Sequence, residues 1–445
     1  MLALQGGTPI RTRRSWPLWP TATPEAAVYL REVLDSHRWT IRSRWVGQST
    51  KERIFAERFA RFNGVPYCVT APSGSLALVL ALEAYNIGVG DEVIIPGLTW
   101  VATAIAVLNV NAIPVLVDVD PTTYCVSPDA IRAAITPRTK CILPVHFHCS
   151  LADMDEIMRI SEAYHLLVIE DCAQSHGARW AGRNVGAIGH AGVFSMHNDK
   201  LLTCGEGGGV ITRDAETYRR LQALRLDGFD FSEVPKPTIE GLYELAEVSD
   251  VMGSSCCLSE FQAAVLIEQL PRLADQNAVR ERNAVYLNML LGQIEGLAPL
   301  GRQPQVELQT FYEYAVRFSS DAFAGCGIYA VCRALSAELG FPVYPEGQPL
   351  HRNPLYKPRV KRRYALGADY MRALDTSQYR LPVAERAPDE VILFLHPALL
   401  GSRQEMEDIA AAFLKVQRHA SELAAIQDQV DALAESPPAQ RGLSP

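Results

Sequence analysis

The chain of 445 residues carries 42 Lys and Arg side chains against 50 Asp and Glu, a formal net charge of -8, and 48% of its residues are hydrophobic. This is the composition of a globular protein, so disorder is excluded as the bulk state, and the length predicts two or three domains of about 150 residues. The acidic balance argues against a nucleic-acid partner. No apolar run approaches the roughly 18 residues of a membrane span, so we expect no membrane contact and a cytoplasmic location.

From residue 66 onward, short β-rich runs alternate with longer helical runs. The expected strands are residues 66–70, 92–96, 113–119, 140–146, 166–170, 191–196 and 209–212, and the expected helices are residues 75–85, 99–110, 128–135 and 154–164. Parallel strands need crossover helices, so this alternation predicts an α/β fold with a mostly parallel sheet and flanking helices. Ligands bind such sheets at the carboxyl ends of the strands, where we expect the site.

A second, smaller unit is expected in the C-terminal part of the chain. A long helical stretch from about residue 258 to 290, interrupted at Pro271, leads into it, and an expected strand at 311–318, a helix at 328–339 and a closing helix from about residue 404 belong to it. The expected domains are an N-terminal arm at 1–27, a large domain at 28–265, a small α/β domain at 266–435 and a flexible tail at 436–445.

An apolar seam recurs at helical spacing near the C-terminus. It is formed by Leu423, Ile426, Val430 and Leu433. Packing against its own domain and contact with a partner helix would both explain this pattern.

The ten cysteines include no Cys-x-x-Cys pair and no His/Cys spacing that suits zinc. We therefore expect no metal site. We interpret the cysteines as reduced thiols that are mostly buried, as is usual in the cytoplasm.

Ser73-Gly74-Ser75 lies between the first expected strand and the helix that follows it. Backbone N–H groups at a helix N-terminus, a glycine that lets a ligand approach and two hydroxyls can together bind an anion. A simple N-cap by Ser73 or Ser75 would explain the same residues without any ligand.

Asp171 directly follows the apolar run at 166–170, at the carboxyl end of an expected strand. A buried carboxylate needs a cationic partner, yet no Arg or Lys occurs within seven residues on either side. A bound cation or a protonated ring nitrogen would satisfy it. Capping of the next turn or pairing with a remote arginine is the alternative.

Lys200 stands between an expected strand and a loop that contains Gly205, Gly207, Gly208 and Gly209. An amine in a partly desolvated site loses its proton more readily and becomes nucleophilic toward a carbonyl group, as a Schiff base requires. The glycines allow the backbone to approach a ligand closely. An ordinary surface lysine is the alternative.

These groups match the needs of one cofactor, pyridoxal 5'-phosphate. Gly74, Ser75 and Ser195 would bind the phosphate. Asp171 would contact the ring nitrogen, and Lys200 would bond the aldehyde. Lys200 would also move the proton of the substrate carbon as general acid and base. Trp100, which follows the strand at 92–96, is a candidate to stack on the ring, with a core tryptophan as the alternative.

The same residues resemble the DegT/DnrJ/EryC1/StrS family of aminotransferases, which have fold type I. The motifs are Ser73-Gly74-Ser75-Leu76-Ala77-Leu78, Pro96-Gly97-Leu98-Thr99-Trp100, Pro144-Val145-His146, Glu170-Asp171-Cys172-Ala173-Gln174-Ser175-His176-Gly177, and Phe194-Ser195 with Lys200 and Gly205-Glu206-Gly207-Gly208. They occur in the family's order, and the resemblance extends from about residue 3 to 415. Within the family, residues 2–9, 16–20, 62–68 and 353–356 are most similar to glutamine:scyllo-inosose and 2-deoxy-scyllo-inosose aminotransferases.

The resemblance implies a homodimer with active sites shared between subunits. It implies that Lys200 bonds the cofactor aldehyde, that Asp171 meets the pyridine nitrogen, and that Gln174 lies near the ring hydroxyl. Gly74, Ser75 and Ser195 would bind the phosphate, Trp100 would stack on the ring, and Ser255 would reach the phosphate of the neighbouring subunit.

The sequence departs from the family pattern at three places. Gly253-Ser254-Ser255 stands where the family usually has Gly-Ser-Asn, so Ser255 offers a shorter side chain. Asp199 would favour the ammonium form of Lys200 if it faces the site and would matter little if it faces solvent. Phe147-His148-Cys149 replaces the usual leucine, aromatic residue and glycine. These changes indicate a relative with an altered acceptor.

The resemblance thus implies a transaminase that carries nitrogen from an amino acid, expected to be L-glutamine, to the ketone of a cyclitol or sugar in aminoglycoside or related biosynthesis. The candidate contacts to ring hydroxyls are His146, Tyr344, His351 and His396, although a structural role explains each of them better.

Other activities stay open at this point. A family member could act on a nucleotide-linked keto sugar or make an aromatic product, as aminohydroxybenzoate synthases do. A dehydratase of the family would tend to lack the lysine, so Lys200 argues against one. A non-catalytic cofactor-binding or sugar-binding regulator would need an attached DNA-binding unit, and the first ~25 residues are too few for it.

Overall fold

The structure is a computed structural model that describes residues 1–12, 15–44, 47–230, 246–247, 251–360, 362 and 365–430. Leu433 and the expected tail at 436–445 lie outside the described residues. No helix in the described part of the chain combines the length and the apolar character needed to cross a lipid bilayer.

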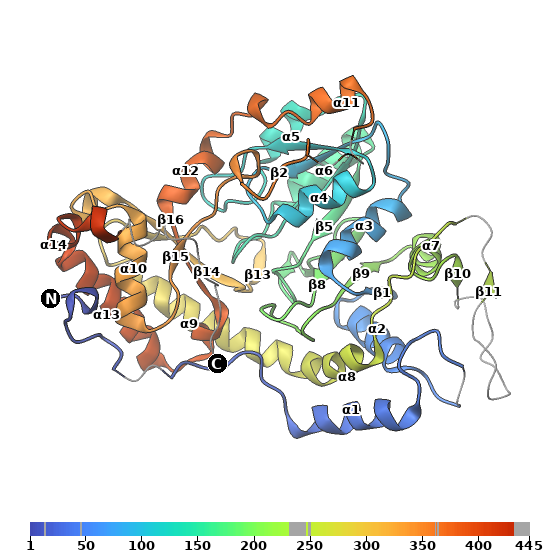
Figure 1. Ribbon diagram of the computed structural model, residues 1–445, viewed down its shortest axis with the longest axis horizontal. Coiled ribbons are helices and arrows are strands. Elements are labelled where there is room, and N and C mark those ends of the chain that lie inside the picture. Colours follow the sequence, from blue (N-terminus) through green and yellow to red (C-terminus); the bar gives the residue numbers. More distant parts are fainter. Residues whose placement is uncertain are drawn as a thin grey trace.

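Within the described residues, seven strands form the main sheet in the order β1-β9-β8-β5-β4-β2-β3 (Figure 1). Their bounds are β1 Tyr67–Ala71, β2 Glu92–Pro96, β3 Ile113–Val117, β4 Thr139–Ile142, β5 Leu167–Asp171, β8 Ala191–Ser195 and β9 Gly208–Thr212. β9 runs antiparallel to its neighbours β1 and β8, whereas β8, β5, β4, β2 and β3 pair in parallel. The carboxyl ends of β2, β5 and β8 therefore meet at one edge of the sheet.

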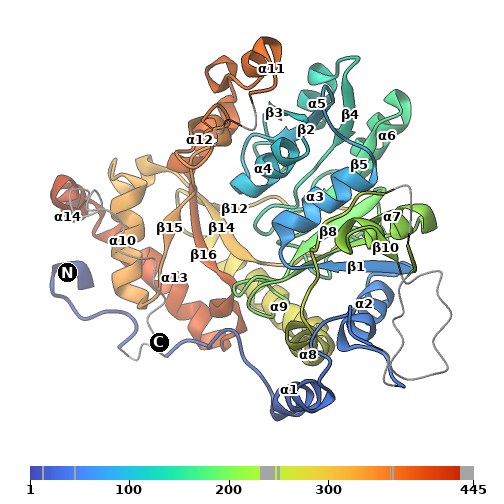
Figure 2. The ribbon, with the colours of Figure 1, turned by 45° about the vertical axis from the view of Figure 1, so that its right-hand side comes forward.

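Crossover helices cover both faces of this sheet. α3 (Gly74–Ala84) packs against α4 (Val101–Asn109), and α5 (Pro128–Ala134) packs against α6 (Met154–Tyr164). Right-handed crossovers between these strands place the first pair on one face and the second pair on the other (Figure 2). The predicted α/β fold with a mostly parallel sheet is confirmed.

A smaller antiparallel sheet has the strand order β12-β14-β16-β15. Its strands are β12 Leu297–Pro299, β14 Glu313–Phe318, β15 Tyr344–Pro345 and β16 Val391–Leu395. α10 (Ile328–Leu339) and α13 (Arg403–Arg418) pack together beside it on the left of Figure 1. α8 (Glu260–Gln269) and α9 (Leu273–Leu291) join the two sheets, and the turn between them contains Pro271, as predicted.

The remaining elements complete these two parts. They are α1 Pro24–Ser36, α2 Lys51–Phe62, α7 Ala215–Arg225, α11 Ala368–Ala373, α12 Pro382–Glu390 and α14 Ala420–Ala424, with the short strands β6 Arg179–Trp180, β7 Arg183–Asn184, β10 Phe229–Asp230, β11 Ala246–Glu247 and β13 Val306–Leu308. The domain boundaries expected from the sequence stay a prediction.

Two predictions about local packing can be compared with the structure. The strand expected at 140–146 ends at Ile142, because Pro144 has no N–H group to donate to a neighbouring strand. In the C-terminal seam, Leu423 and Val430 are buried in the chain's own core. For the described residues of the seam, the structure therefore favours core packing.

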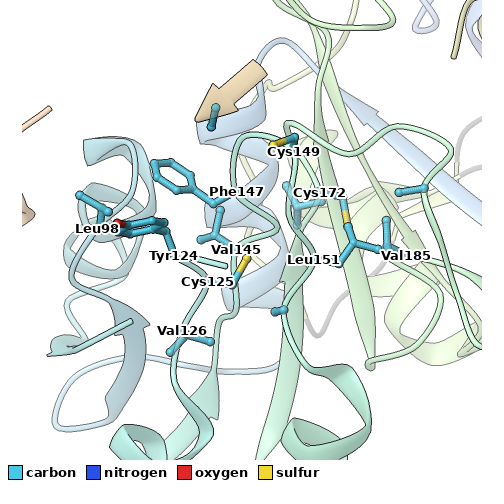
Figure 3. Close-up of a cluster of buried hydrophobic side chains, with 14 of the residues drawn as sticks. Leu98, Tyr124, Cys125, Val126, Val145, Phe147, Cys149, Leu151, Cys172 and Val185 are labelled. Carbon is cyan, nitrogen blue, oxygen red and sulfur yellow. The ribbon is translucent and has the colours of Figure 1, made fainter. Parts of the chain in front are cut away.

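A cluster of buried hydrophobic side chains includes residues of the segments that follow β4 and β5 (Figure 3). Phe147, Leu151 and Cys172 are each 5% exposed or less and belong to one hydrophobic core. All ten cysteines are described; none forms a disulfide, and seven of them are buried, which confirms the expectation that they are mostly buried. Burial raises the pKa of Cys125 and of Cys149 to about 12, so these thiols stay protonated.

The first residues of the chain lie along the smaller sheet's helices before reaching α1 (Figure 1). Arg11 pairs with Glu405 at 2.9 Å and with Asp408 at 3.0 Å, both on α13. Trp16 Nε1 donates to the carbonyl oxygen of Leu339, at the end of α10, at 2.8 Å. This N-terminal segment is therefore held to the small sheet's helices by specific contacts.

Arg225 on α7 and Glu52 on α2 form a buried ion pair at 2.6 Å, and each side chain is 1% exposed. Replacing Arg225 by methionine should lower the free energy of unfolding by about 3–5 kcal/mol, because Glu52 would be left as an unpaired buried charge. Urea unfolding measures this change. The control is Arg386→Met, which removes an exposed pair with Glu390 and should cost less than about 1 kcal/mol. Equal losses in the two variants would contradict the prediction.

Candidate active site

Asp171 is the last residue of β5 and is 5% exposed. Its Oδ1 accepts a hydrogen bond from the Ala173 N–H at 3.1 Å, and its Oδ2 accepts one from the Thr103 hydroxyl at 3.1 Å. Burial raises the pKa of Asp171, and these hydrogen bonds oppose the rise. No salt bridge to Asp171 occurs among the described residues, so the carboxylate retains its need for a cationic partner.

Trp100 lies at the start of α4, three residues before Thr103. Trp100 is the N-cap of this helix, and its carbonyl oxygen accepts the N–H of Thr103, whose hydroxyl contacts Asp171, at 3.2 Å. Trp100 is 62% exposed, which shows that the core-tryptophan alternative is wrong. Its ring is free to cover a ligand bound over the carboxyl edge.

Lys200 lies in the loop between β8 and β9, with its Nζ 3.7 Å from the centre of the Tyr312 ring. Burial lowers the pKa of Lys200 to about 8, against the opposing effect of the carboxylates of Glu313, Asp171 and Asp199. A pKa near 8 leaves about one amine in ten unprotonated at pH 7, against about one in 3000 for an ordinary lysine. The structure thus gives this amine the desolvation that nucleophilicity needs.

Asp199 has a smaller effect on Lys200 than its place in the sequence suggests. Its side chain is 30% exposed, and its Oδ1 accepts a hydrogen bond from the Asn198 amide at 3.0 Å. It favours the ammonium form of Lys200, but by less than Glu313 and Asp171 do.

Glu313, at the start of β14, belongs to a buried cluster that sequence reasoning missed. Its carboxylate accepts hydrogen bonds from His148 Nδ1 at 2.7 Å and from the Tyr344 hydroxyl at 2.6 Å, and His148 Nε2 bonds Glu346. Burial lowers the pKa of His148, but Glu346 and Glu313 outweigh it and raise the pKa to about 10. A cationic His148 therefore joins the segment after β4 to the smaller sheet beside Lys200.

Replacing Glu313 by glutamine should lower the pKa of Lys200 below 8, because Glu313 is the carboxylate that stabilises the ammonium form most. The pH dependence of reductive methylation of the Lys200 peptide, read by mass spectrometry in cofactor-free protein, measures this pKa. Glu346→Gln is the matched control, because it also removes one carboxylate from His148 but is not among the charges that act on Lys200. An unchanged midpoint in Glu313→Gln would contradict the prediction.

The start of α3 lies against the end of β8. The Ser73 hydroxyl accepts a hydrogen bond from the Leu76 N–H at 3.2 Å, so Ser73 is the N-cap, as the simple alternative requires. A Cβ placed on Gly74 would lie 2.6 Å from the Cβ of Ser195, so only glycine fits here. Ser75 is exposed at the first turn of α3. The capped helix thus still offers N–H groups of its first turn to a ligand.

Gln174 contacts the cluster beside Lys200, whereas the side chain of Ser255 contacts Arg42. Gln174 is 8% exposed, and its Oε1 accepts the N–H of His148 at 2.5 Å. Ser255 is exposed, and its hydroxyl lies 3.4 Å from Arg42, which also pairs with Asp227.

The four candidate contacts to substrate hydroxyls each have a partner within the protein. His146 Nε2 lies 3.2 Å from Glu170 Oε2, His351 Nε2 lies 3.0 Å from Glu385, and Tyr344 donates to Glu313. His396 is 0% exposed and bonds the carbonyl oxygen of Asp199 at 3.0 Å. Of these four, Tyr344 shares its partner with the cluster beside Lys200.

One group of potential metal ligands occurs among the described residues, formed by His146, Glu170 and Cys172, with donor atoms within 4.8 Å of one another. Glu170 there accepts backbone N–H groups of Gly186, Ile188 and Gly189 at 2.6–2.8 Å. These three hydrogen bonds stabilise the buried carboxylate of Glu170, so its burial does not require a bound metal ion.

A separate hollow of about 440 Å³ is lined by residues that include Arg61, Arg179, Arg183 and Arg213. It contains none of the site residues expected from the sequence. The chemistry-bearing side chains lie instead at the carboxyl edge of the main sheet.

This fold, the buried carboxylate of Asp171 and the amine of lowered pKa whose charge acts on it fit an aminotransferase, and this is the class of the protein. The sequence profile of the DegT/DnrJ/EryC1/StrS aminotransferase family matches residues 30–413, so the chain belongs to that family. The resemblance drawn from the motifs is thereby confirmed.

Three relatives illustrate the similarity. The chain is 50% identical to an L-glutamine:2-deoxy-scyllo-inosose aminotransferase of Streptoalloteichus tenebrarius over 95% of this chain and 99% of that protein. It is 46% identical to the L-glutamine:scyllo-inosose aminotransferase of Streptomyces griseus over 93% and 97%. The crystal structure of a 3-amino-5-hydroxybenzoic acid synthase superposes with a TM-score of 0.76 at 29% identity, over 91% of this chain and 99% of that one. The solved structures that resemble this chain have fold type I, as predicted.

Proposed function

We propose that the protein transfers the amino group of L-glutamine to the ketone of a cyclitol, scyllo-inosose or 2-deoxy-scyllo-inosose, in aminoglycoside or related biosynthesis. The observation that carries the chemistry is the buried carboxylate of Asp171, which lacks an ion-pair partner among the described residues, near an amine whose pKa is lowered to about 8. The substrates are those named for relatives that match this chain over nearly its whole length.

The residues present fit pyridoxal 5'-phosphate, the cofactor that the family resemblance implies. Gly74 lets the start of α3 pack directly against Ser195, where any side chain would clash, so the N–H groups of the first turn of α3 lie beside the Ser195 hydroxyl. A carboxylate, an amine and an anion cradle are the three groups that the ring nitrogen, the aldehyde and the phosphate require. When bound, the cofactor supplies a protonated ring that delocalises the negative charge left when the substrate carbon loses a proton.

We assign the following tasks to the residues of the site. Asp171 accepts a hydrogen bond from the ring nitrogen and keeps that nitrogen protonated. Lys200 would hold the cofactor aldehyde, and its Nζ would take and return the proton of the substrate carbon. The amide group of Gln174 donates to the ring hydroxyl, and Trp100 covers the ring. Gly74, Ser75 and Ser195 bind the phosphate.

We also propose that the active enzyme is a homodimer in the cytoplasm. The exposure of Trp100 and of Ser255 is consistent with this proposal, because a second subunit could cover both side chains. Ten free cysteines suit a reducing compartment. Light scattering during size-exclusion chromatography measures the mass, and a monomer with full activity would contradict shared sites.

Incubation with the cofactor, L-glutamine labelled at its α-nitrogen with ¹⁵N, and a panel of ketones tests the function. We expect the label in an aminocyclitol formed from scyllo-inosose or 2-deoxy-scyllo-inosose, and none in products from nucleotide-linked keto sugars. Mass spectrometry identifies the products. Amination of the nucleotide-linked sugars alone, or formation of an aromatic product, would assign the enzyme to another branch of the family.

A further inference from the structure

Two successive carbonyl groups immediately before Lys200 are held by side chains from remote parts of the chain. Trp19 Nε1 donates to the carbonyl oxygen of Asn198 at 3.1 Å, and His396 Nε2 lies 3.0 Å from the carbonyl oxygen of Asp199. Trp19 belongs to the N-terminal segment, whereas His396 follows β16 of the smaller sheet. The loop that carries the amine is therefore tied to two elements outside the main sheet.

Arg280 on α9 determines which nitrogen of His396 carries the proton. Its Nε lies 3.2 Å from His396 Nδ1, and arginine can only donate hydrogen bonds. His396 Nδ1 is therefore the acceptor, so its Nε2 is protonated and donates to the Asp199 carbonyl. Asn277 holds Arg280 in turn, with its Oδ1 accepting from Nη1 at 3.1 Å.

The three side chains also pack on one another. The Trp19 ring meets the His396 ring edge to face at 4.8 Å, and the Arg280 guanidinium lies 5.0 Å from the centre of the Trp19 ring. His396 and Arg280 are both 0% exposed. No acidic side chain pairs with Arg280 among the described residues, so its contacts are those with Asn277, His396 and Trp19.

The backbone of His396 also bonds the residue whose ring contacts the amine. Its backbone N–H donates to the carbonyl oxygen of Tyr312 at 3.1 Å, and the Lys200 Nζ lies 3.7 Å from the centre of the Tyr312 ring. One residue thus holds both the backbone before Lys200 and the residue against which its amine rests.

We propose that Trp19, His396 and Arg280 are positioning residues, which hold the Lys200 loop through the Asn198 and Asp199 carbonyls and make the reactivity of the amine depend on the placement of the Trp19 ring against this loop. This inference rests on the proposed role of Lys200. Displacement of a reacting group by about 1 Å can cost about 100-fold in rate, so a loosened loop should lower kcat. It should also let water reach the amine, which would raise the pKa of Lys200 from about 8 toward that of ordinary lysine.

The test compares two tryptophans of the same segment. Trp19→Phe keeps an aromatic ring but removes the hydrogen bond to the Asn198 carbonyl. Trp16→Phe removes an equivalent hydrogen bond to the carbonyl of Leu339, which is far along the chain from Lys200. We expect Trp19→Phe to lower kcat about tenfold with little change in KM for glutamine, and to raise the methylation midpoint of Lys200 in cofactor-free protein by about half a pH unit or more. Trp16→Phe should change neither quantity.

A second pair of variants examines His396. His396→Leu should reproduce and exceed the effects of Trp19→Phe, and His396→Gln, whose amide can still donate to the Asp199 carbonyl, should recover most of the loss. If Trp19→Phe and Trp16→Phe behave alike in both measurements, the proposal is wrong, even where His396→Leu fails to fold.

A separate experiment shows whether Lys200 itself has the proposed role. Borohydride reduction of wild-type protein incubated with pyridoxal 5'-phosphate should attach the cofactor to the Lys200 peptide. Attachment to another lysine would overturn the role of Lys200 and the positioning proposal with it. Attachment to Lys200 without any effect of Trp19→Phe would overturn the positioning proposal alone.

Discussion

Replacing Lys200 by alanine is expected to leave a folded protein that cannot bond the cofactor and whose transamination rate falls by at least about 1000-fold. The reason is that one amine both holds the aldehyde and moves the proton of the substrate carbon. Visible absorbance after addition of pyridoxal 5'-phosphate measures the first property, and the release of aminocyclitol measures the second.

Two further variants make this result specific. Lys357→Ala changes an exposed lysine and should leave both measurements unchanged. Lys200→Arg keeps a positive charge, yet its guanidinium stays protonated and should be as inactive as alanine. If Lys200→Ala still binds the cofactor covalently, the nucleophile lies elsewhere.

Asp171→Asn is expected to lower kcat by about 100- to 1000-fold with the fold intact, because a neutral amide cannot hold a positive charge on the ring nitrogen. The amide still fits between the Ala173 N–H and the Thr103 hydroxyl, so folding should suffer little. Steady-state kinetics and thermal unfolding separate the two effects.

Thr103→Val is the matched comparison for Asp171. It removes one of the two hydrogen bonds to the carboxylate but leaves the charge, and should cost about tenfold or less. A similar loss in Asp171→Asn and Thr103→Val would mean that hydrogen bonding, and not charge, is what the cofactor requires from this position.

Much of the main sheet was predictable because its signals are local. Helix α6 at Met154–Tyr164 and strand β2 at Glu92–Pro96 begin and end where the apolar pattern predicted. In the smaller sheet, β15 has only Tyr344 and Pro345 and is a strand because β16 pairs with it. Such an element has no pattern of its own, so sequence reasoning missed it.

Two site residues could be predicted from the sequence, because a carboxylate directly after a buried strand and a lysine beside a glycine-rich loop are unusual without a ligand. Asp171 and Lys200 were found in this way, and their roles stay predictions. Glu313 and His148 were missed, because 165 residues separate two groups whose partnership arises only when the smaller sheet packs beside the larger. Phe147-His148-Cys149 was noted as a departure from the family pattern, which was the signal available.

By itself, the sequence determined the alternation of strands and helices, the acid at the end of β5, the amine in the loop after β8 and the family, since each depends on neighbouring residues or on motif order. Tertiary structure decided how reactive that amine is. Burial lowers its pKa to about 8, Glu313 opposes the change, and Trp19 and His396 hold its loop from 179 and 197 residues away. Desolvation and charge act through space, so only the folded chain determines their values.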